Sequence, residues 1–371
     1  MGRKKREWPL FFLCLSAALY GLALIFSATR YEETLHGLVG KQAVALGGGV
    51  VLCLLLSVLD VRKLLEKLWW LLPVVNVGLL LLLVPLGNDD GTGNKSWISL
   101  PGGGFNLQPA EVVKISFLLL LALQLRKLGE KGLNRPKAVF LLLLHVLALC
   151  ALLYGVSGDI GMVAVYLAVY LVMLWSAGVH PLWLLGEVAA GVGAVVLLWP
   201  RLPEYVRMRF LVVFDHGLDP LGKGFQQERS LLAIGSGQVT GQGYLQGTQT
   251  QSPSPSALPA RHTDFIFSVI GAELGLVGCL LTLALLTAII LRCLYVARHA
   301  KTRLEGYACI GVASVIIFQV IINVGMCLFV MPVIGLTLPF ISYGGSSLVM
   351  LFACMGLVSG VHGRAKPDWL R

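Results

Sequence analysis

Long apolar runs constrain this chain more than any other feature of its sequence. The segments FLLLLALQL (117–125), LLLLHVLALCALLY (141–154) and LLTLALLTAIIL (280–291) contain no acidic residue, lysine or arginine. A helix needs about 20 apolar residues to cross a bilayer, whereas membrane barrels show short alternating segments. Of the 371 residues, 57% are hydrophobic and only 13% are charged. We therefore predict an all-α integral membrane protein, folded as a single domain over residues 1–371.

The apolar runs divide the chain into ten predicted spans. Each is about as long as a helix that crosses the hydrocarbon core. The spans are 8–28, 38–58, 68–87, 108–126, 137–155, 159–178, 181–199, 264–291, 304–328 and 342–361.

Basic residues are unevenly divided between the two sides of these spans. With the N-terminus inside, nineteen Lys and Arg residues fall in cytoplasmic segments, whereas the short outer loops hold only Arg30, Lys41 and Lys95. Cytoplasmic loops of membrane proteins are enriched in Lys and Arg. The distribution predicts a multi-pass protein of the cytoplasmic membrane with both termini cytoplasmic. It also accounts for the net charge of +10 without a nucleic-acid partner.

Three segments on the predicted outer side are more than simple connectors. Residues 88–107 are rich in glycine, and residues 200–263 form a loop of a length that is usually functional or disordered. Within that loop, 203–214 predicts a short interfacial helix and 226–247 begins like a helix. Residues 331–347 carry two prolines and a Gly-Gly-Ser-Ser run at membrane depth. Irregular backbone there must be buried in protein or line a wet cavity.

Polar residues open the fourth predicted span. Gln108, Glu111 and Lys114 recur every three residues and form one stripe that runs inward from the outer surface. Glu111 and Lys114 are spaced to form an ion pair. Ionisable groups inside a membrane mark functional sites by default. The stripe is either a structural ion pair or part of a substrate cavity, and the two interpretations are compatible.

Two aspartates stand at the outer starts of spans. Asp159 begins the sixth span and Asp264 the eighth, where a carboxylate can cap a helix or stabilise its first turn. Asp159 would join the charged cluster if it lay near Lys114. Glu273 lies on the other side of its helix from Asp264 and is expected to have a structural partner. His262 is either a base or an ordinary loop residue.

The sequence lacks the motifs of several enzyme classes. It has no HExxH or CxxC pair, no P-loop and no GxSxG element. Carboxylates and a lysine remain at the outer membrane face, with a basic loop above them. Such a site suits an anionic, amphiphilic substrate that is handled outside the cytoplasm.

Four longer motifs follow one another along the chain. They are NKSWISLPGGGFNLQPAEVVKI (94–115), FQQERSLLAIGSGQVTGQGYLQG (225–247), LPARHTDFIFSVIGAELG (258–275) and NVGMCLFVMPVIGLTLPFISYGGSSL (323–348). In this order the motifs resemble the shape, elongation, division and sporulation (SEDS) family, which includes RodA and FtsW. The resemblance covers nearly the whole chain, including the ten spans and the large loop between spans seven and eight.

The resemblance implies a bacterial peptidoglycan glycosyltransferase. Such an enzyme polymerises lipid II, an undecaprenyl-diphosphate-linked disaccharide-pentapeptide, on the outer face of the cytoplasmic membrane. The essential aspartate of the family maps onto Asp264, which becomes the candidate catalytic residue. The candidate substrate-binding residues are Trp97, Gln108, Glu111, Lys114, Asp159, Arg207, Arg209, His262 and Ser346.

The chain departs from the family pattern at a few positions. The usual QPDLG reads SGDIG around Asp159, and Ala110 replaces a serine. Ala272 replaces an acid in GEELG, so that acid is not required here. Phe329 replaces a glycine. These departures leave Asp264 intact.

The expected reaction inverts the anomeric carbon and needs one base. Asp264 would take the proton from the 4-hydroxyl of the acceptor sugar. Arg207, Arg209 and Lys114 are candidate cations for the departing diphosphate. A divalent cation, Mg²⁺ or Mn²⁺, is left open.

The resemblance also implies partners. A class B penicillin-binding protein would cross-link the strands, within the elongation or division complex. The short ends of the chain resemble RodA more than FtsW, which favours a role in elongation and cell shape. The alternatives are a division or sporulation paralogue with the same activity, a lipid II flippase or other transporter, and a non-catalytic scaffold.

Overall fold

The computed structural model describes residues 7–30, 32–88, 94–99, 105–215, 218, 222–252 and 257–364. Nearly all of its regular structure is helical. The larger helices are α1 (Trp8–Thr29), α2 (Gly37–Leu56), α6 (Pro109–Gly129), α7 (Pro136–Ser157), α8 (Ile160–Ala177), α9 (Pro181–Leu198), α11 (Lys223–Ser236), α12 (Ile266–Arg298), α13 (Arg303–Cys327) and α14 (Gly345–His362). The shorter ones are η1 (Glu33–Leu35), α3 (Val61–Leu68), α4 (Leu71–Leu81), α5 (Leu83–Leu86), η2 (Trp199–Arg201) and α10 (Glu204–Leu211).

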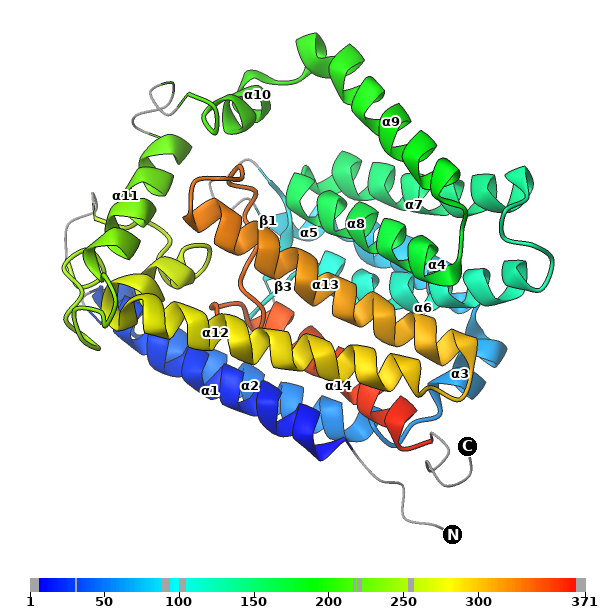
Figure 1. The fold of residues 1–371 in the computed structure, drawn as a ribbon, viewed down its shortest axis with the longest axis horizontal. Coiled ribbons are helices and arrows are strands. Elements are labelled where there is room, and N and C mark those ends of the chain that lie inside the picture. The colour runs from blue at the N-terminus through cyan, green and yellow to red at the C-terminus, as the bar shows by residue number, and fades with distance from the viewer. Residues whose placement is uncertain are drawn as a thin grey trace.

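The long helices lie roughly side by side in one bundle (Figure 1). Helix α14 is the most buried, and it packs along α2 and against α6, α12 and α13. Small residues let the α2 and α14 backbones approach closely. A side chain at Gly356 would overlap the Cys53 carbonyl, and one at Gly49 would press on Phe352. Close packing of small residues is how helices associate in lipid, where burial of apolar surface gives no advantage.

The structure confirms the predicted ten-span, all-α membrane fold. Eight described helices are long and apolar enough to cross a membrane: α1, α2, α7, α8, α9, α12, α13 and α14. The shorter apolar helices α4 and α5 supply the third predicted span, and α6, which carries Glu111 and Lys114, supplies the fourth.

The third span differs from the prediction of one helix over 68–87. The chain is helical from Val61, because Asp60 caps α3 by accepting a hydrogen bond from the Lys63 amide. The helix is then interrupted after Leu68 and again at Leu82. The third span is therefore two short helices preceded by a capped amphipathic one.

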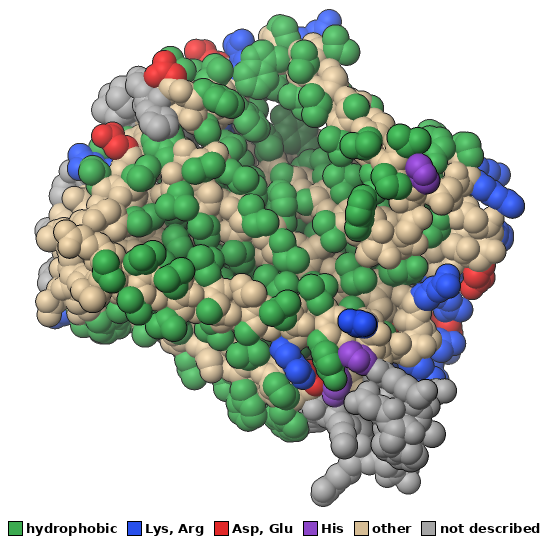
Figure 2. Space-filling view, in the orientation of Figure 1, with side chains coloured by type: hydrophobic (Ala, Val, Ile, Leu, Met, Phe, Trp, Pro, Cys, Tyr) green, Lys and Arg blue, Asp and Glu red, His purple; other side chains and the backbone are tan. Residues whose placement is uncertain are grey.

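The surface of the bundle is what a lipid environment requires. Hydrophobic side chains cover its flank, and Lys and Arg gather mainly at its edges (Figure 2). Helix α9 diverges from the bundle (Figure 1), and only 6% of its most apolar 18-residue stretch is buried. The surface is hollowed between α9 and the helices below it (Figure 2).

The two ends of the bundle are built differently. At one end, here called the terminal end, α1 begins and α14 finishes, and Glu7 pairs with His362 at 3.0 Å. The other end, here called the loop end, carries α10, α11 and a three-stranded antiparallel sheet (Figure 1). Its strands are β1 (Gly87–Asn88), β2 (Trp97–Ser99) and β3 (Asn106–Leu107), with Ile98 opposite both Gly87 and Leu107. Helices α10 and α11 are the two helices predicted within 200–263.

Helix α12 is broken near the loop end at Gly275, where φ is +65°. The segment 237–243 fills the break. The amides of Gln242 and Gly243 donate to the carbonyls of Ala272 and Glu273, and the Leu276 amide donates to the Gln238 carbonyl. Backbone groups freed at membrane depth need such partners. The long loop is therefore part of the bundle rather than a cover over it.

Glu273 fixes the same loop through its side chain. Its fully buried carboxylate accepts hydrogen bonds from Ser27 Oγ, Thr250 Oγ1 and Gln251 Nε2, each at 2.7 Å. It also accepts from the Leu245 amide at 3.2 Å. The prediction of a structural partner for Glu273 is confirmed.

Candidate functional site

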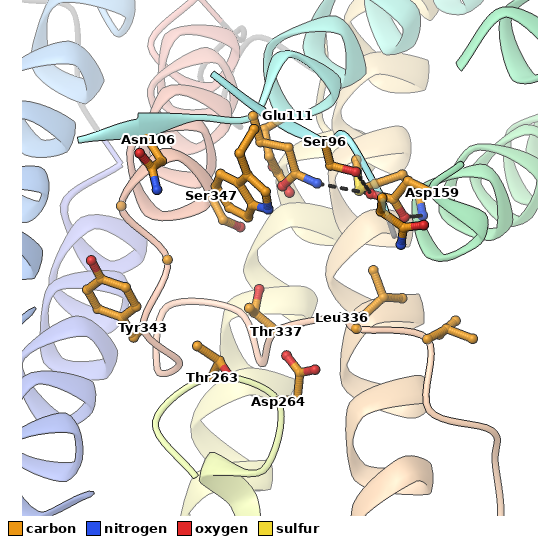
Figure 3. Close-up of a pocket in the computed structure, with 18 of the residues that line it drawn as sticks. Ser96, Asn106, Glu111, Asp159, Thr263, Asp264, Leu336, Thr337, Tyr343 and Ser347 are labelled. Atoms are coloured by element: carbon orange, nitrogen blue, oxygen red, sulfur yellow. Dashed lines mark hydrogen bonds between the residues drawn. The ribbon is translucent and has the colours of Figure 1, made fainter. Parts of the chain in front are cut away.

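A cavity of about 470 Å³ opens at the loop end. Its walls come from α2, the strand β2 and the residues around it, the starts of α6, α8 and α14, helices α10 and α13, the turn before α12, and the irregular segment 333–345 (Figure 3). That volume lies in the ordinary range of small-molecule sites. Most of the lining is polar or ionisable, including Lys41, Glu111, Asp159, Arg209 and Asp264.

Asp264 projects into this cavity from the turn that precedes α12 (Figure 3). Three successive carbonyls hold the turn. His262 accepts from the Tyr343 amide at 2.8 Å, and Thr263 accepts from Ser342 Oγ at 2.7 Å. Asp264 itself accepts from Asn323 Nδ2 at 2.8 Å. The backbone of Asp264 is therefore fixed by two segments that lie far from it in sequence.

Asp264 does not occupy the N-cap position of α12. Helix α12 begins two residues later, at Ile266, and Phe265 in the N-cap position makes no side-chain cap. The three carbonyl contacts hold residues 262–264 in a turn, so the helix cannot extend back to Asp264. The Asp264 carboxylate points toward the cavity (Figure 3).

Asp159 lies across the cavity and is a helix cap, as predicted. Its carboxylate accepts from the Met162 amide at 2.9 Å and so caps α8. It also accepts from Gln108 Nε2 at 3.1 Å and from Ser96 Oγ at 3.4 Å (Figure 3). Asp159 is thus joined to the start of α6 through Gln108, and no hydrogen bond or ion pair links it to Lys114.

Glu111 and Lys114 form the predicted ion pair. Lys114 Nζ lies 2.6 Å from Glu111 Oε2, and each side chain is at most 3% exposed. Glu111 lines the cavity, whereas Lys114 lies behind it. Lys114 does not line the cavity, and its charge is paired with that of Glu111. It is therefore not placed to bind a ligand there.

The two loop arginines predicted to bind the diphosphate, Arg207 and Arg209, have different positions in the structure. Arg209, on α10, lines the cavity. Arg207, two residues earlier, does not, and its buried Nε has no hydrogen-bond acceptor among the described residues. Residues two apart on a helix do not share a face.

Three other predicted residues have different positions. Trp97, on β2, lines the cavity, whereas Ser346 and His262 do not. Ser346 Oγ donates to the Asn106 carbonyl at 2.6 Å and accepts from the Gln108 amide at 3.3 Å, so it joins α14 to the sheet. The ring of His262 lies against Tyr343, and burial lowers the pKa of this imidazole.

Sequence reasoning missed several residues of the cavity wall. Lys41, Gln319, Thr337, Tyr343 and Ser347 all line it. Lys41, in the first turns of α2, was visible as one of the few basic residues outside the cytoplasmic segments. Gln319 is an isolated amide in the apolar α13, and Thr337, Tyr343 and Ser347 approach the cavity only because 333–345 folds back over Asp264.

A metal fits the described residues poorly. No group of three or more His, Cys, Asp or Glu side chains among them lies close enough to hold an ion. Asp159 and Glu111 are already engaged by hydrogen-bond donors and by Lys114. The open prediction of Mg²⁺ or Mn²⁺ therefore gains no support from this donor set.

The fold and cavity define a polytopic membrane protein with a carboxylate-lined site at one end of its bundle. The family model described as "Cell cycle protein", which covers FtsW, RodA and SpoVE, matches residues 8–366. The chain belongs to this family.

Individual relatives are similar over almost their whole length. The probable peptidoglycan glycosyltransferase FtsW of Geobacter metallireducens is 32% identical, over 97% of this chain and 96% of its own. The peptidoglycan glycosyltransferase MrdB of Escherichia coli is also 32% identical, over 98% and 97%.

Solved structures agree with the fold. A chain from a peptidoglycan synthase complex, solved to describe the coordination of polymerization and crosslinking, superposes with a TM-score of 0.81. It is 32% identical and covers 96% of this chain and 97% of its own. The rod shape determining protein RodA of Thermus thermophilus superposes with a TM-score of 0.71 at 29% identity, covering 98% of each chain.

Proposed function

We propose that this chain polymerises lipid II at the cavity lined by Asp264, with Asp264 as the general base. The chain is a peptidoglycan glycosyltransferase of the multi-pass membrane type, in keeping with the FtsW and MrdB relatives. One observation carries the assignment of the site. The Asp264 carboxylate faces a 470 Å³ cavity from a turn that three hydrogen bonds hold in place.

The chemistry requires one base and one stabilised leaving group. The acceptor hydroxyl attacks the anomeric carbon of the donor sugar as its proton passes to the Asp264 carboxylate. A new glycosidic C–O bond forms while the bond from the anomeric carbon to the diphosphate breaks, and the diphosphate leaves as an anion. Attack from the face opposite the diphosphate inverts the α-linked donor to a β-linked product. Diphosphate is a good leaving group, so the second carboxylate of a glycosidase is not needed as an acid.

The other carboxylates have binding roles in this proposal. Asp159 and Glu111 lie across the cavity from Asp264 and are held by Gln108 and Lys114 (Figure 3). Fixed carboxylates accept hydrogen bonds from sugar hydroxyls and amides. Trp97 offers a flat apolar face on the same wall. These groups would orient a sugar while Asp264 takes the proton.

We place the loop end, and with it the cavity, outside the cytoplasm, and both termini inside. The start of α1 and the end of α14 meet at the terminal end, through Glu7 and His362. The basic segments 60–67, 126–137 and 292–303 connect helices away from the cavity. Enrichment of cytoplasmic loops in Lys and Arg supports this orientation.

A class B penicillin-binding protein is the proposed partner. The support is the similarity to a chain of a peptidoglycan synthase complex that couples polymerization to crosslinking. Elongation remains the proposed role. Relatives named FtsW and MrdB are equally similar at 32% identity, so a division or sporulation role is the alternative.

The transporter alternative receives less support from the fold. A transporter binds its substrate near the bilayer midplane, between repeats that rock against each other. Here the cavity opens at one end of the bundle, and a wall of buried side chains from α6, α13 and α14 lies beneath it.

The test is polymerisation of purified lipid II by wild-type protein and the variant Asp264→Asn. Loss of glycan product is expected, because the amide cannot accept the proton. Glu204→Gln is the matched control, since Glu204 is an exposed acid of the loop end outside the cavity. Wild-type rates from a folded Asp264→Asn variant would remove Asp264 from the mechanism.

A further inference from the structure

The N-terminus of α14 opens into the cavity. Gly344, Gly345 and Ser347 line it, and the helix runs for 18 residues behind them. The first amides of a helix have no acceptor within the helix, and here no side chain caps them. The positive end of the helix dipole therefore faces the cavity with unused N–H donors.

Ser347 adds a second, independent feature at this helix start. Its side chain is 94% buried, being 6% exposed, and its Oγ has no hydrogen-bond partner among the described residues. Figure 3 shows Ser347 within the cavity, on the side away from Asp264. A buried hydroxyl without a partner is unfavourable, so this group is available to hydrogen-bond a ligand that enters the cavity.

Lys41 supplies a full positive charge beside the same helix start. Its neighbour Gln42 accepts from the Gly344 amide at 3.1 Å and donates to the Ser342 carbonyl at 3.2 Å. A Cβ atom added at Gly345 would lie 3.6 Å from the Cβ of Ala45, one turn further along α2, so α2 packs closely against the start of α14. Lys41 lines the cavity and makes no hydrogen bond or ion pair within the described part of the chain. In this it differs from Lys114, whose charge is matched by Glu111.

We propose that Lys41, Ser347 and the first amides of α14 form a binding site for the diphosphate of the lipid-linked substrate. An ammonium group, a hydroxyl and helix N-terminal amides are the donors that hold phosphate groups in many proteins. The inference rests on the proposed function, which supplies the diphosphate. It replaces Lys114, one of the three cations predicted from sequence, with a lysine that lines the cavity.

The position of this site suits the reaction. When the bond from the anomeric carbon to the diphosphate oxygen breaks, the electron pair stays with the diphosphate, and the acceptor proton moves to Asp264. Negative charge therefore grows at one side of the cavity as it is neutralised at the other. Donors already aimed at the growing charge stabilise the transition state more than the ground state.

Anionic lipids of the bilayer carry phosphate too, and the site is assigned to a diphosphate rather than to them. A single phosphodiester offers only one phosphate group to Lys41 and the helix start. A diphosphate has two phosphoryl groups and can engage both at once. Two charge-assisted contacts made by one rigid group bind more tightly than either alone.

The experiment measures binding of undecaprenyl diphosphate to the purified full-length protein in detergent, without any sugar. Lys41→Ala and Ser347→Ala are each expected to weaken binding about tenfold, and Lys41→Arg is expected to restore most of it. Lys95→Ala removes an exposed outer lysine outside the cavity and is the matched control, with unchanged binding. Phosphatidylglycerol is expected to compete poorly.

Three results would overturn the inference: wild-type binding by both alanine variants, equal loss in Lys95→Ala, or equal competition by phosphatidylglycerol. A folded Asp264→Asn variant separates the two proposals, since it should bind undecaprenyl diphosphate normally while failing to polymerise. If the wild type binds diphosphate at this site but does not polymerise lipid II, the proposed function fails and the site stands. In polymerisation assays, Lys41→Ala should reduce kcat more than it raises KM.

Discussion

The side-chain amide of Asn323, near the end of α13, donates a hydrogen bond of 2.8 Å to the backbone carbonyl of Asp264. The same amide group donates to the Leu336 carbonyl at 2.7 Å. One fully buried side chain thus joins the turn that carries the candidate base to the neighbouring segment 333–345, which forms part of the same cavity wall (Figure 3). The position of Asp264 depends on α13 as much as on its own helix.

Removing Asn323 is expected to impair catalysis more than folding. Asn323→Leu removes the amide donor from the Leu336 carbonyl and leaves the Asp264 carbonyl only the weak Cys327 Sγ donor at 3.7 Å, at a cost of about 1–3 kcal/mol. A displacement of the base by about 1 Å can lower the rate about 100-fold. Lipid II polymerisation by the purified variant measures the effect. The control is Ser314→Ala, which removes a buried hydroxyl from the same helix. Equal polymerisation rates for the two variants would contradict a positioning role for Asn323.

The buried pair Glu111–Lys114 predicts an unequal response to single and double substitution. Lys114→Met leaves a buried carboxylate without its partner and should cost about 3–5 kcal/mol of unfolding free energy. Glu111→Gln combined with Lys114→Met should cost less than the single change, which thermal unfolding in detergent would show. Arg62→Met, at an exposed pair, should cost at most about 1 kcal/mol. A stable double variant that cannot bind substrate would assign the pair to the cavity rather than to stability alone.

Gly237 should not tolerate alanine. A side chain there would overlap the carbonyls of Gly271 and Ala272, because the 237–243 segment lies directly against α12. Overpacking typically costs about 1–3 kcal/mol, and here both neighbours are backbone that cannot rotate away. The amount of folded protein in membranes is the measurement. Gly47→Ala, on the open face of α2, should accumulate normally, and matching levels would mean that the segment is loosely held.

Acid should destabilise the protein partly through His262. Burial lowers the pKa of this imidazole below its ordinary value of 6.5, so the folded state takes up its proton at a lower pH than the unfolded state. The contribution of the buried neutral imidazole to the free energy of unfolding is fully present above pH 6.5. It is lost as the pH falls from 6.5 through the lower pKa of the folded state. Unfolding midpoints between pH 8 and pH 5 should fall less for His262→Asn than for wild type. Parallel curves would show that this residue does not contribute.

The fold could be predicted from sequence because hydrophobic length determines most of it. Each apolar run became a helix, and the basic segments identified which loops share a side. The third span was harder, since the cap at Asp60 starts a helix earlier than hydropathy suggests. The break at Gly275 could not be foreseen either. Its partners lie in 237–243, and nothing local shows that a loop will replace a turn of helix.

The same distinction between local and distant contacts applies to the candidate site. Asp159 and the Glu111–Lys114 pair follow from local spacing, and both lie as predicted. Asp264 was located by motif, but its place in a turn before α12 was not, because that turn depends on Asn323, Ser342 and the Tyr343 amide folding back from later in the chain. Contacts made across such separations leave no period in the sequence.

The broken helix α12 also bears on how the protein is made. The segment 237–243 is synthesised before α12 and must meet a helix that has not yet emerged when the segment itself leaves the ribosome. Until Gln242 and Gly243 reach the carbonyls of Ala272 and Glu273, the polar backbone at Gly275 lies in lipid without partners. The loop-end quarter of α12 is therefore expected to enter the bilayer late, together with its loop. Biogenesis of this protein then has a step that hydropathy does not reveal: the insertion of a hairpin made from two segments thirty residues apart.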